Sequence, residues 1–501
     1  MLRIAAWTCL LALANVSCGE PTYKQRESVW ASDASPMLYS ASLPLSVAET
    51  VTNAQSFSQA SRIHVVESLP VGDFELLPLP GSKNTAEALV ELIDSALHRL
   101  DIFAMYWNLL GEEDRGEHSP KEMKRFGADR GVAVFNAIER ATQRGVPVRV
   151  IGSSNPAFAP KELDKLQVQL RLWNSSHWYG GGIMHQKMVI ADGQHAYVGS
   201  ANMDWKSLAQ VMEVGVVIES TPAVVEDMAR LFELWWLWSG PTAPLGAPVD
   251  VFVEKFQCTL RLPRWSSFVP PQWHQPSPFS SPSLSSSYNK DNPMSVVWND
   301  EASNVFITAS PDAATAKSRT LDEDGLVYTI QSAKERVSLS VMDFTPFSTF
   351  PIETLKEGSI YWPALTDAVL RVVYARPVTV RLLISQWLHS SQVMIHGLKL
   401  LKGQADLCVK CRGSLEIRLM QVPGWNQTEA PQSTWPQYSR VNHAKYIVTD
   451  ELANIGTSNM EWGYFYNTAG TSLNTDNKYV KDALQQIFDR NWNSPYAKPL
   501  P

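Results

Sequence analysis

Hydrophobic residues follow two periods along this chain, and the two periods alternate. In some stretches the apolar residues recur at helical spacing and form one face. Between these stretches are short runs of β-branched and apolar residues, which are typical of buried strands. The first part of the chain has predicted helices over 85–98, 131–144 and 223–238 and predicted strands over 100–105, 146–152 and 168–173. The last part has predicted strands over 336–342, 378–384 and 415–420 and predicted helices over 362–374 and 481–491. This alternation indicates an α/β fold in which helices cover a sheet.

The two parts share one order of elements and are separated by a segment of different composition. Residues 241–293 are rich in proline and serine, most of all in the run 276–287. Proline lacks an N–H donor and serine adds little burial, so we predict a linker or surface excursion there. We therefore predict two duplicated α-β-α sandwich domains, over 61–240 and 294–501, related by a pseudo-twofold axis within one chain.

The N-terminal residues predict a secretory leader. The apolar run within residues 1–19 is too short to span a bilayer comfortably, so we expect a cleaved signal peptide, with an uncleaved anchor as the alternative. Residues 20–60 are polar with little periodicity and predict a flexible segment. In a secretory protein, Asn174-Ser-Ser and Asn426-Gln-Thr would be candidate glycosylation sites.

Composition and charge narrow the class of protein. The chain has 501 residues, of which 45% are hydrophobic and 18 are Trp, as expected of a folded protein. Its formal net charge of -7 excludes a protein that coats duplex nucleic acid by neutralising phosphates, so any such contact is local. The single CxxC, Cys408 to Cys411, predicts a local disulfide or two unused thiols rather than a zinc site.

One polar pattern interrupts the hydrophobic pattern twice, with its two histidines 258 residues apart. It reads His-x-Lys-x4-Asp, followed by Gly and Asn. The first copy is His185, Lys187, Asp192, Gly199 and Asn202, and the second is His443, Lys445, Asp450, Gly456 and Asn459. On a strand, residues i and i+2 share a face, so each copy is predicted to project an imidazole and an ammonium together.

These side chains suit an anion better than a metal. An ammonium repels cations and Asn is a weak ligand, so we expect no metal and no other cofactor. If the pseudo-twofold axis brings both copies together, the lysines with Asn202 and Asn459 can hold the non-bridging oxygens of a phosphodiester. One imidazole can then attack phosphorus while the other protonates the leaving oxygen.

The doubled pattern with its Gly-(Ser/Thr)-x-Asn ending resembles the phospholipase D superfamily. That resemblance implies a duplicated α-β-α fold and a metal-independent route through a phosphohistidine. It extends from about Ser61 to Tyr496 and is closest to the endolysosomal branch of phospholipase D-like 5′-to-3′ exonucleases. The stretches that carry it include Ile63-His-Val-Val-Glu67, Met105-Tyr-Trp107, Gly199-Ser-Ala-Asn-Met-Asp-Trp205, Leu382-Leu-Ile-Ser-Gln-Trp387, Val441-Asn-His-Ala-Lys-Tyr446 and Asn493-Ser-Pro-Tyr496.

The resemblance implies an enzyme that degrades single-stranded DNA or RNA from a free 5′-hydroxyl end in the lysosomal lumen or after secretion. The alternative is a phospholipid hydrolase or transphosphatidylase that uses the same site, and a catalytically idle binding protein is disfavoured by the intact histidines and lysines. We expect no stable duplex binding, and the oligomeric state is open, with a homodimer among the options. Two departures from the branch are the cleavable-looking N-terminus and the ending Asn459-Met-Glu-Trp462.

Roles within the site follow from one asymmetry. Glu213 lies in an apolar stretch 28 positions after His185 and needs a partner, whereas residues 468–472 after His443 hold no carboxylate. We therefore expect Glu213 to bond His185 as the nucleophile, with His443 as general acid positioned by Thr471 or by backbone; the reverse assignment stays open.

The remaining candidates are scaffold and substrate-binding residues. Asp192 and Asp450 lie near turns and predict a capping role rather than proton transfer. The other residues expected to support the motif are Gly199, Ser200 and Gly456. Aromatic side chains near predicted strand ends are candidates for base stacking, and His389 is a candidate contact for the terminal phosphate or 5′-hydroxyl. The aromatic candidates are Tyr106, Trp107, Phe344, Trp387 and Trp462.

Overall fold

The structure is a computed structural model, which describes residues 60–154, 161–174, 182–240, 248–253, 258–266, 269–275, 284–348, 360–428 and 434–501. The predicted signal peptide at 1–19 and the predicted leader, except for its last residue, lie outside this part of the chain, as does much of the predicted linker. Ser175 and Ser176 of one candidate glycosylation site also lie outside it, whereas Asn426 of the other is exposed. Among the described residues, no helix combines the length and the apolar character needed to cross a membrane.

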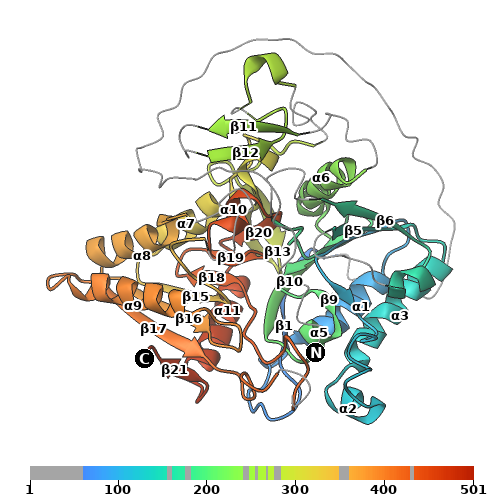
Figure 1. Ribbon diagram of the computed structural model, residues 1–501, viewed down its shortest axis with the longest axis horizontal. Coiled ribbons are helices and arrows are strands. Elements are labelled where there is room, and N and C mark those ends of the chain that lie inside the picture. Colours follow the sequence, from blue (N-terminus) through green and yellow to red (C-terminus); the bar gives the residue numbers. More distant parts are fainter. Residues whose placement is uncertain are drawn as a thin grey trace.

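Two large sheets organise the chain (Figure 1). In spatial order, the eight strands of the first sheet are β2 (Lys83–Asn84), β1 (Arg62–Ser68), β10 (Glu213–Glu219), β8 (His195–Gly199), β7 (Met188–Ala191), β3 (Leu100–Ala104), β5 (Val148–Ser153) and β6 (Val168–Trp173). The nine strands of the second are β13 (Met294–Trp298), β14 (Glu301–Ser310), β20 (Gly470–Thr475), β19 (Ala453–Gly456), β18 (Tyr446–Thr449), β15 (Arg336–Val341), β16 (Thr379–Ser385), β17 (Ser414–Met420) and β21 (Ala497–Pro499). Two small sheets pair β4 (Trp107–Asn108) with β9 (Met203–Asp204) and β11 (Val249–Val253) with β12 (Cys258–Leu262).

Seven strands of each large sheet match in order and direction. The run β1-β10-β8-β7-β3-β5-β6 corresponds to β14-β20-β19-β18-β15-β16-β17. In both runs the first four pairings are antiparallel and the last two are parallel. The predicted duplicated α/β fold is therefore confirmed, while the predicted domain boundaries at 240 and 294 stay predictions.

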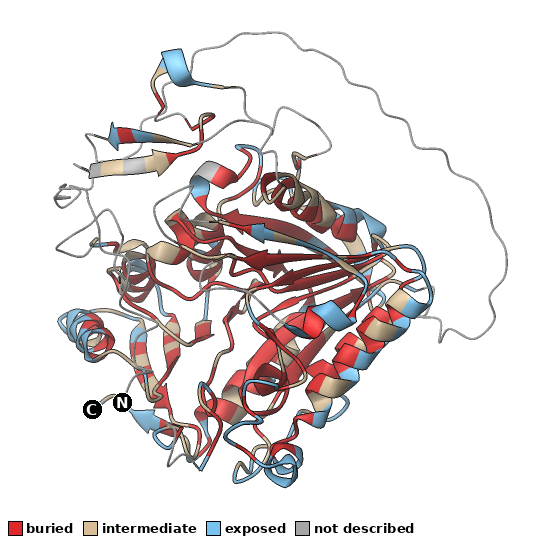
Figure 2. Ribbon diagram, turned by 45° about the vertical axis from the view of Figure 1, so that its right-hand side comes forward, coloured by how far each residue is buried: buried red, intermediate tan, exposed pale blue. Residues whose placement is uncertain are grey.

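Helices cover both faces of each sheet (Figures 1 and 2). The helices are α1 (Thr85–Asp94), α2 (Pro120–Arg125), α3 (Asp129–Gln143), α5 (Trp205–Ala209), α6 (Pro222–Trp238), α7 (Asp322–Ser332), α8 (Ala364–Ala375), α9 (Gln392–Asp406), α10 (Gly463–Tyr466) and α11 (Lys478–Trp492). Apolar residues of α1 and α3 pack on one face of the first sheet, and those of α7, α8 and α9 pack on one face of the second. The opposite faces of both sheets share one central core with α6 and α11. Because this core is continuous, the two halves form a single packed unit.

Buried polar contacts reinforce the junction between the halves. Arg319 forms a two-pronged ion pair with Asp227 of α6, with N–O distances of 2.8 and 3.0 Å. Arg490 of α11 pairs in the same way with Glu67 of β1, at 2.9 and 2.7 Å. Planar guanidinium groups match carboxylates in this geometry, so these contacts set the orientation of the halves as well as holding them together.

Asp192 and Asp450, the aspartates of the two motif copies, have the same structural role. Both oxygens of Asp192 accept hydrogen bonds from the backbone N–H groups of Leu97, His98 and Arg99, at 2.7 to 2.8 Å. Asp450 accepts from the corresponding backbone of residues 334–336, at 3.0 to 3.2 Å. Each aspartate thus caps the turn that leads into the central strand β3 or β15, in agreement with the predicted scaffold role.

We expect Asp192→Asn to lower the free energy of unfolding by about 1–3 kcal/mol, because one acceptor oxygen is replaced by a donor that faces backbone N–H groups. Asn tolerates the positive φ of 57° at this position, so backbone strain does not contribute to the loss. Thermal melting and the activity per folded molecule measure the effect. A variant that melts like the wild type but has lost its activity would contradict the scaffold role.

Candidate active site

The two His-x-Lys segments lie just before strands, not on them. β7 begins at Met188 and β18 at Tyr446, so His185, Lys187 and their counterparts occupy the extended segments that enter these strands. The prediction that the motif lies on a strand is therefore wrong by a few residues. The strands remain fully buried, and the polar side chains gather where the strands begin.

Each histidine is held by the backbone of the opposite half. The N–H of His185 donates to the carbonyl of Ala469 at 2.9 Å, and the N–H of His443 donates to the carbonyl of Met212 at 2.8 Å. Parallel bridges Met184–Ala469 and Met212–Asn442 accompany these bonds. The two entry segments therefore cross at the junction of the halves, which brings both motif copies into one buried site.

The two lysines are also buried, and each folds back on its own motif. Nζ of Lys187 donates to the carbonyl of His185 at 2.9 Å, and Nζ of Lys445 donates to the carbonyl of His443 at 2.7 Å. Burial lowers the pKa of Lys445 to about 7, against the opposing charges of Glu213 and Asp343. Burial also lowers the pKa of Lys187 well below its ordinary value, and Lys445 lowers it further. A bound anion would relieve both effects, because negative charge favours the ammonium forms.

Glu213 contacts His443 and not His185. Both carboxylate oxygens lie 2.9 Å from Nδ1 of His443, and the carboxylate is fully enclosed. The expectation that Glu213 orients His185 is therefore wrong. It failed because residues of β10 reach across the junction, so a carboxylate that follows one histidine along the chain serves the other in space. Burial lowers the pKa of His443 to about 4, while Glu213 acts in the opposite direction.

The matching position in the second half is Gly470. Gly199 pairs with Gly215 and Gly456 pairs with Ser472, so residue 470 corresponds to residue 213. A Cβ atom at Gly470 would lie 2.2 Å from the hydroxyl oxygen of Ser458, so no larger side chain fits there. Thr471, proposed from the sequence to position His443, instead donates its hydroxyl hydrogen to the carbonyl of Thr308 at 2.7 Å.

His185 therefore lies in a less polar setting than His443. Its Nδ1 has no side-chain hydrogen-bond partner among the described residues, and the ring of Tyr464 meets its own ring edge to face at 4.8 Å. Burial lowers the pKa of His185 well below its ordinary value, and the charges of Lys187 and Lys445 add to this effect. These effects favour the neutral form of this ring, and a bound anion beside it would favour the protonated form that a proton donor needs.

Asp343 is a residue of the site that the sequence reasoning missed. Its carboxylate accepts a hydrogen bond of 3.0 Å from the amide of Asn459, which also donates to the hydroxyl of Tyr464 at 3.0 Å. Burial raises the pKa of Asp343 to about 6, although Lys445 opposes the rise. The duplication could have predicted this residue, because Met342-Asp-Phe344 follows β15 just as Met105-Tyr-Trp107 follows β3. Asp343 therefore corresponds to Tyr106, which was a predicted site residue.

The glycines and Ser200 of the motif have structural roles. A Cβ atom at Gly199 would lie 2.5 Å from Cα of Gly215, and one at Gly456 would lie 2.2 Å from the hydroxyl oxygen of Ser472. The Ser200 hydroxyl exchanges hydrogen bonds with the backbone of Val214 at 3.0 and 3.1 Å. Close strand packing therefore explains these positions.

Three of the aromatic candidates belong to packed clusters. Trp107 and Phe344 are 6% and 2% exposed and lie in the cores of the first and second halves, so a stacking role is wrong for both. The backbone of Trp107 pairs with Met203, and the backbone of Phe344 pairs with Met460. These pairings hold both side chains facing inward. Trp462 directly precedes α10, is half-buried and stacks on Tyr466 of that helix, with ring centroids 5.2 Å apart.

The other aromatic candidates belong to a series of neighbouring rings that begins at His185 and includes exposed side chains. Tyr464 contacts the His185 ring and lies within electrostatic range of Tyr106, which is 43% exposed. Tyr106 lies within the same range of Tyr438, which is 53% exposed. Tyr438 stacks on His389 at 5.2 Å, and His389 meets Trp387 at 4.7 Å. We call Tyr464, Tyr106, Tyr438, His389 and Trp387 the aromatic path. Tyr438 was not predicted, because it lies in a loop without a hydrophobic pattern.

The donor set favours an anionic ligand. Imidazole, ammonium and amide groups surround the point where the two halves meet, and these can donate several hydrogen bonds to phosphate oxygens. Among the residues that the structure describes, no group of three or more His, Cys, Asp or Glu side chains is arranged to hold a metal ion.

Comparison with known proteins finds two matching family models and several relatives that align with most of the chain. A family model described as "PLD3/4, PLD-like domain" matches residues 260–424, and one described as "Cardiolipin synthase, PLD-like domain" matches residues 89–236. A probable phospholipase D of Caenorhabditis elegans is 33% identical over 87% of this chain and 70% of its own length. The 5′-3′ exonuclease PLD3 of Xenopus laevis is 32% identical, over 90% of this chain and 83% of its own. The virion nicking-joining enzyme of vaccinia virus is 32% identical, over 87% of this chain and 89% of its own.

These relatives match nearly the whole chain, and the duplicated sheets carry both copies of the His-x-Lys motif to one site. The protein belongs to the phospholipase D superfamily, in the branch that contains the PLD3 exonucleases.

Proposed function

We propose that this protein is a metal-independent phosphodiesterase that removes nucleotides from the 5′-hydroxyl end of single-stranded DNA or RNA. The observation that carries the proposal is the meeting of two His-Lys pairs, one from each half, with Glu213 bound to only one of the imidazoles. The names of relatives support it, since they include a 5′-3′ exonuclease and a nicking-joining enzyme. Others are named as phospholipases D, so a phospholipid is the alternative substrate.

His443 is the proposed nucleophile, which reverses the assignment made from the sequence. The carboxylate of Glu213 accepts the Nδ1 proton of His443, which leaves the Nε2 lone pair free to attack phosphorus. When the N–P bond forms, the imidazole becomes positively charged, and Glu213 stabilises that charge. The P–O bond to the 5′ oxygen of the next nucleotide breaks at the same time.

His185 is the proposed general acid and base. In the first step its proton passes to the leaving 5′ oxygen, so that an alcohol departs rather than an alkoxide. In the second step it removes a proton from water, the water oxygen bonds to phosphorus, and the bond to His443 breaks. The products are a nucleotide 3′-phosphate and the regenerated enzyme. An alcohol in place of water would give a transferred phosphodiester instead.

The lysines and Asn202 supply the charge and hydrogen bonds that hold the phosphate. Lys187 and Lys445 neutralise the non-bridging oxygens, which become more negative as the N–P bond forms. Asn202 is buried, and its Nδ2 is the atom that can donate to a phosphate oxygen, since Oδ1 only accepts. A bound phosphodiester also favours the protonated form of His185, because it adds negative charge beside that ring.

The aromatic path favours a nucleic acid over a lipid. Aromatic faces stack on bases of any sequence, with about 1–3 kcal/mol per base lost on alanine substitution. Acyl chains would need an aliphatic channel, whereas the exposed members of this path are tyrosine and histidine rings. A secretory or lysosomal location, a cleaved signal peptide and a glycan on Asn426 are further parts of this proposal.

A substrate panel tests the proposal. We expect the purified protein to degrade 5′-hydroxyl single-stranded DNA at acid pH with chelator present, and to leave its 5′-phosphorylated twin and phosphatidylcholine intact. His185→Ala and His443→Ala should each abolish turnover. Release of choline without nucleotide release would establish the phospholipase alternative, and loss of activity with chelator would refute the metal-free route.

We expect Glu213→Gln to lower kcat on the order of 10²-fold or more, since the charge of the phosphohistidine loses its partner. It should also move the acidic limb of the pH profile to lower pH, because Glu213 raises the pKa of His443 and a nucleophile must be neutral. The alkaline limb, set by His185, should stay in place. Glu219→Gln, a buried carboxylate on the same strand, is the matched control. Movement of the alkaline limb instead would make His443 the general acid.

We expect Tyr438→Ala to raise KM for single-stranded DNA roughly tenfold and to leave kcat nearly unchanged, because stacking on a base outside the reacting phosphate is lost. Tyr361→Ala, an exposed tyrosine outside the aromatic path, serves as the control. The same KM for both variants would remove the aromatic path from the substrate site.

A further inference from the structure

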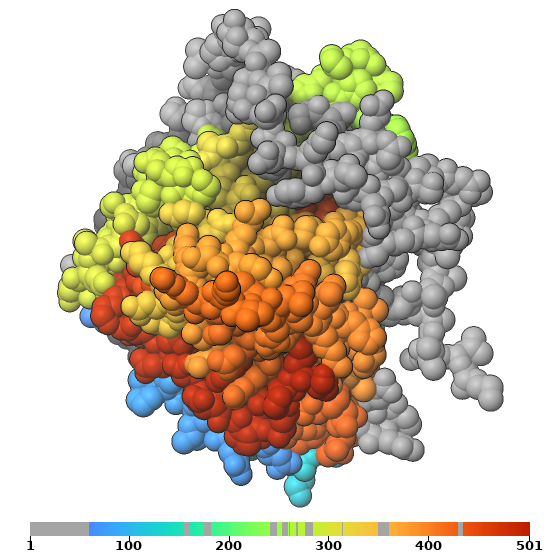
Figure 3. Space-filling model, turned by 90° about the vertical axis from the view of Figure 1, so that its left-hand side faces the viewer, coloured from blue at the N-terminus to red at the C-terminus, as the bar shows by residue number. Residues whose placement is uncertain are grey.

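Helix α9 and the loop that follows it present apolar side chains to solvent. Val393, Leu400, Leu407 and Val409 are 53, 61, 77 and 93% exposed. The first three are spaced seven residues apart, so they lie along one side of the helix. The opposite side of α9 is buried in the core of the second half. Figure 3 shows the orange residues of α8 and α9 across the middle of this face of the molecule.

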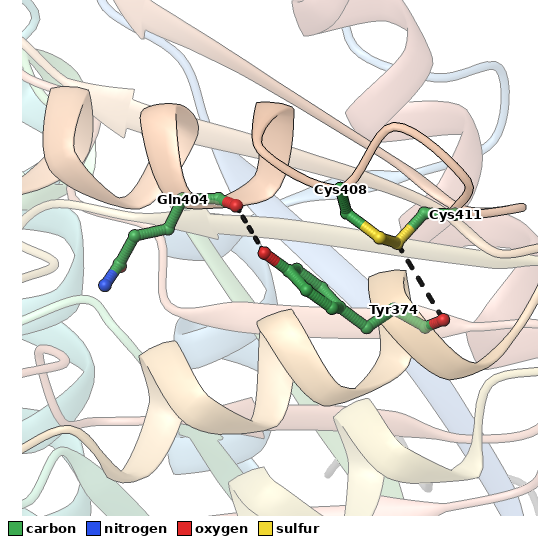
Figure 4. Close-up of a disulfide and its surroundings, with 4 residues drawn as sticks. All are labelled: Tyr374, Gln404, Cys408 and Cys411. Atoms are coloured by element: carbon green, nitrogen blue, oxygen red, sulfur yellow. Dashed lines mark hydrogen bonds between the residues drawn. A yellow bond between two sulfur atoms is a disulfide. The ribbon is translucent and has the colours of Figure 1, made fainter.

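A disulfide fixes the end of this apolar line. Figure 4 shows the disulfide between Cys408 and Cys411, directly after α9. Val409 lies between these two cysteines in sequence and so belongs to the small closed ring. The hydroxyl of Tyr374 in α8 donates to the carbonyl of Gln404 at 2.6 Å, and Sγ of Cys411 lies 3.8 Å from the carbonyl of Tyr374. These contacts tie the loop to α8, so the ring is presented rather than folded inward.

The charge of this segment is opposite in sign to that of the whole chain. Residues 392–412 contain Lys399, Lys402, Lys410 and Arg412 against the single acidic residue Asp406, a net charge of +3 in a chain of -7. Lys402 pairs with Asp406, whereas the other three form no ion pair with the described residues. The exposed leucine and valine side chains therefore lie among basic groups that face solvent.

We propose that this face, the α9 face, docks the protein on an anionic lipid surface. Leu407 and Val409 enter the boundary between headgroups and acyl chains, and Lys399, Lys410 and Arg412 contact the negative headgroups. Apolar side chains and basic groups together give reversible binding of this kind. The charge favours this partner over a second copy of the chain, whose own basic face would repel it.

Only the N-terminal end of α9 adjoins the aromatic path. The helix begins at Gln392, three residues after His389 of that path. Leu407 and Val409 lie at the other end of this 15-residue helix, so docking does not require the site itself to face the membrane, and the inference does not depend on the identity of the substrate.

Vesicle sedimentation with the full-length protein tests the proposal. The probes are vesicles of phosphatidylcholine alone and of phosphatidylcholine with phosphatidylglycerol. We expect binding to the anionic vesicles at least tenfold stronger than to the neutral ones, and weaker binding as salt rises. Equal binding to both kinds of vesicle, or to neither, would overturn the proposal.

Paired variants locate the surface. Leu407→Ser with Val409→Ser, and Lys410→Glu with Arg412→Glu, should each lower the partition onto anionic vesicles at least tenfold. The controls are Leu77→Ser, which is 76% exposed elsewhere, and Lys121→Glu with Lys124→Glu on α2. Hydrolysis of a short soluble substrate should be unchanged in all four variants, which separates failure of docking from failure of the proposed activity. If the controls weaken binding equally, or if sedimentation velocity shows that the α9 face holds a dimer together, the lipid surface is wrong.

Discussion

Two crossed backbone hydrogen bonds set the geometry on which the site depends. The N–H of His185 donates to Ala469 in the second half, and the N–H of His443 donates to Met212 in the first. Each imidazole is therefore placed by the half that does not contain it in sequence. The shared core with α6 and α11 and the ion pairs at the junction hold this crossing rigidly, because a shift of either sheet would move one histidine relative to the other.

The two motif copies are alike in backbone and different in surroundings. Glu213 reaches across to His443, whereas Gly470 occupies the matching position near His185, and Ser458 leaves no space there for a side chain. Asp343 and Tyr106 follow the corresponding strands with different chemistry. A symmetric fold thus carries an asymmetric site, which suits a reaction in which one imidazole bonds to phosphorus and the other moves a proton.

Much of the fold could be predicted from the sequence. The eleven helices and strands predicted from periodicity all lie within a few residues of observed elements. In such segments the spacing of apolar residues directly indicates whether a helix or a strand buries one face. Helices α7 and α9 were missed, although α9 has an apolar face, because its exposed leucines blur the pattern. The His-Lys pairs could be predicted from their repetition. The contact between Glu213 and His443 could not be predicted, because the spacing of residues along the chain does not show that the two halves cross at the site.

The presence of both halves in one polypeptide has an evolutionary consequence. In an assembly of two identical subunits, any carboxylate placed beside one imidazole would also appear beside the other, and both rings would be equally suited to either task. Fusion of the copies removes that restriction, because a substitution then enters only once. The glycine at 470 opposite the glutamate at 213 is a difference that only a covalently joined pair can keep.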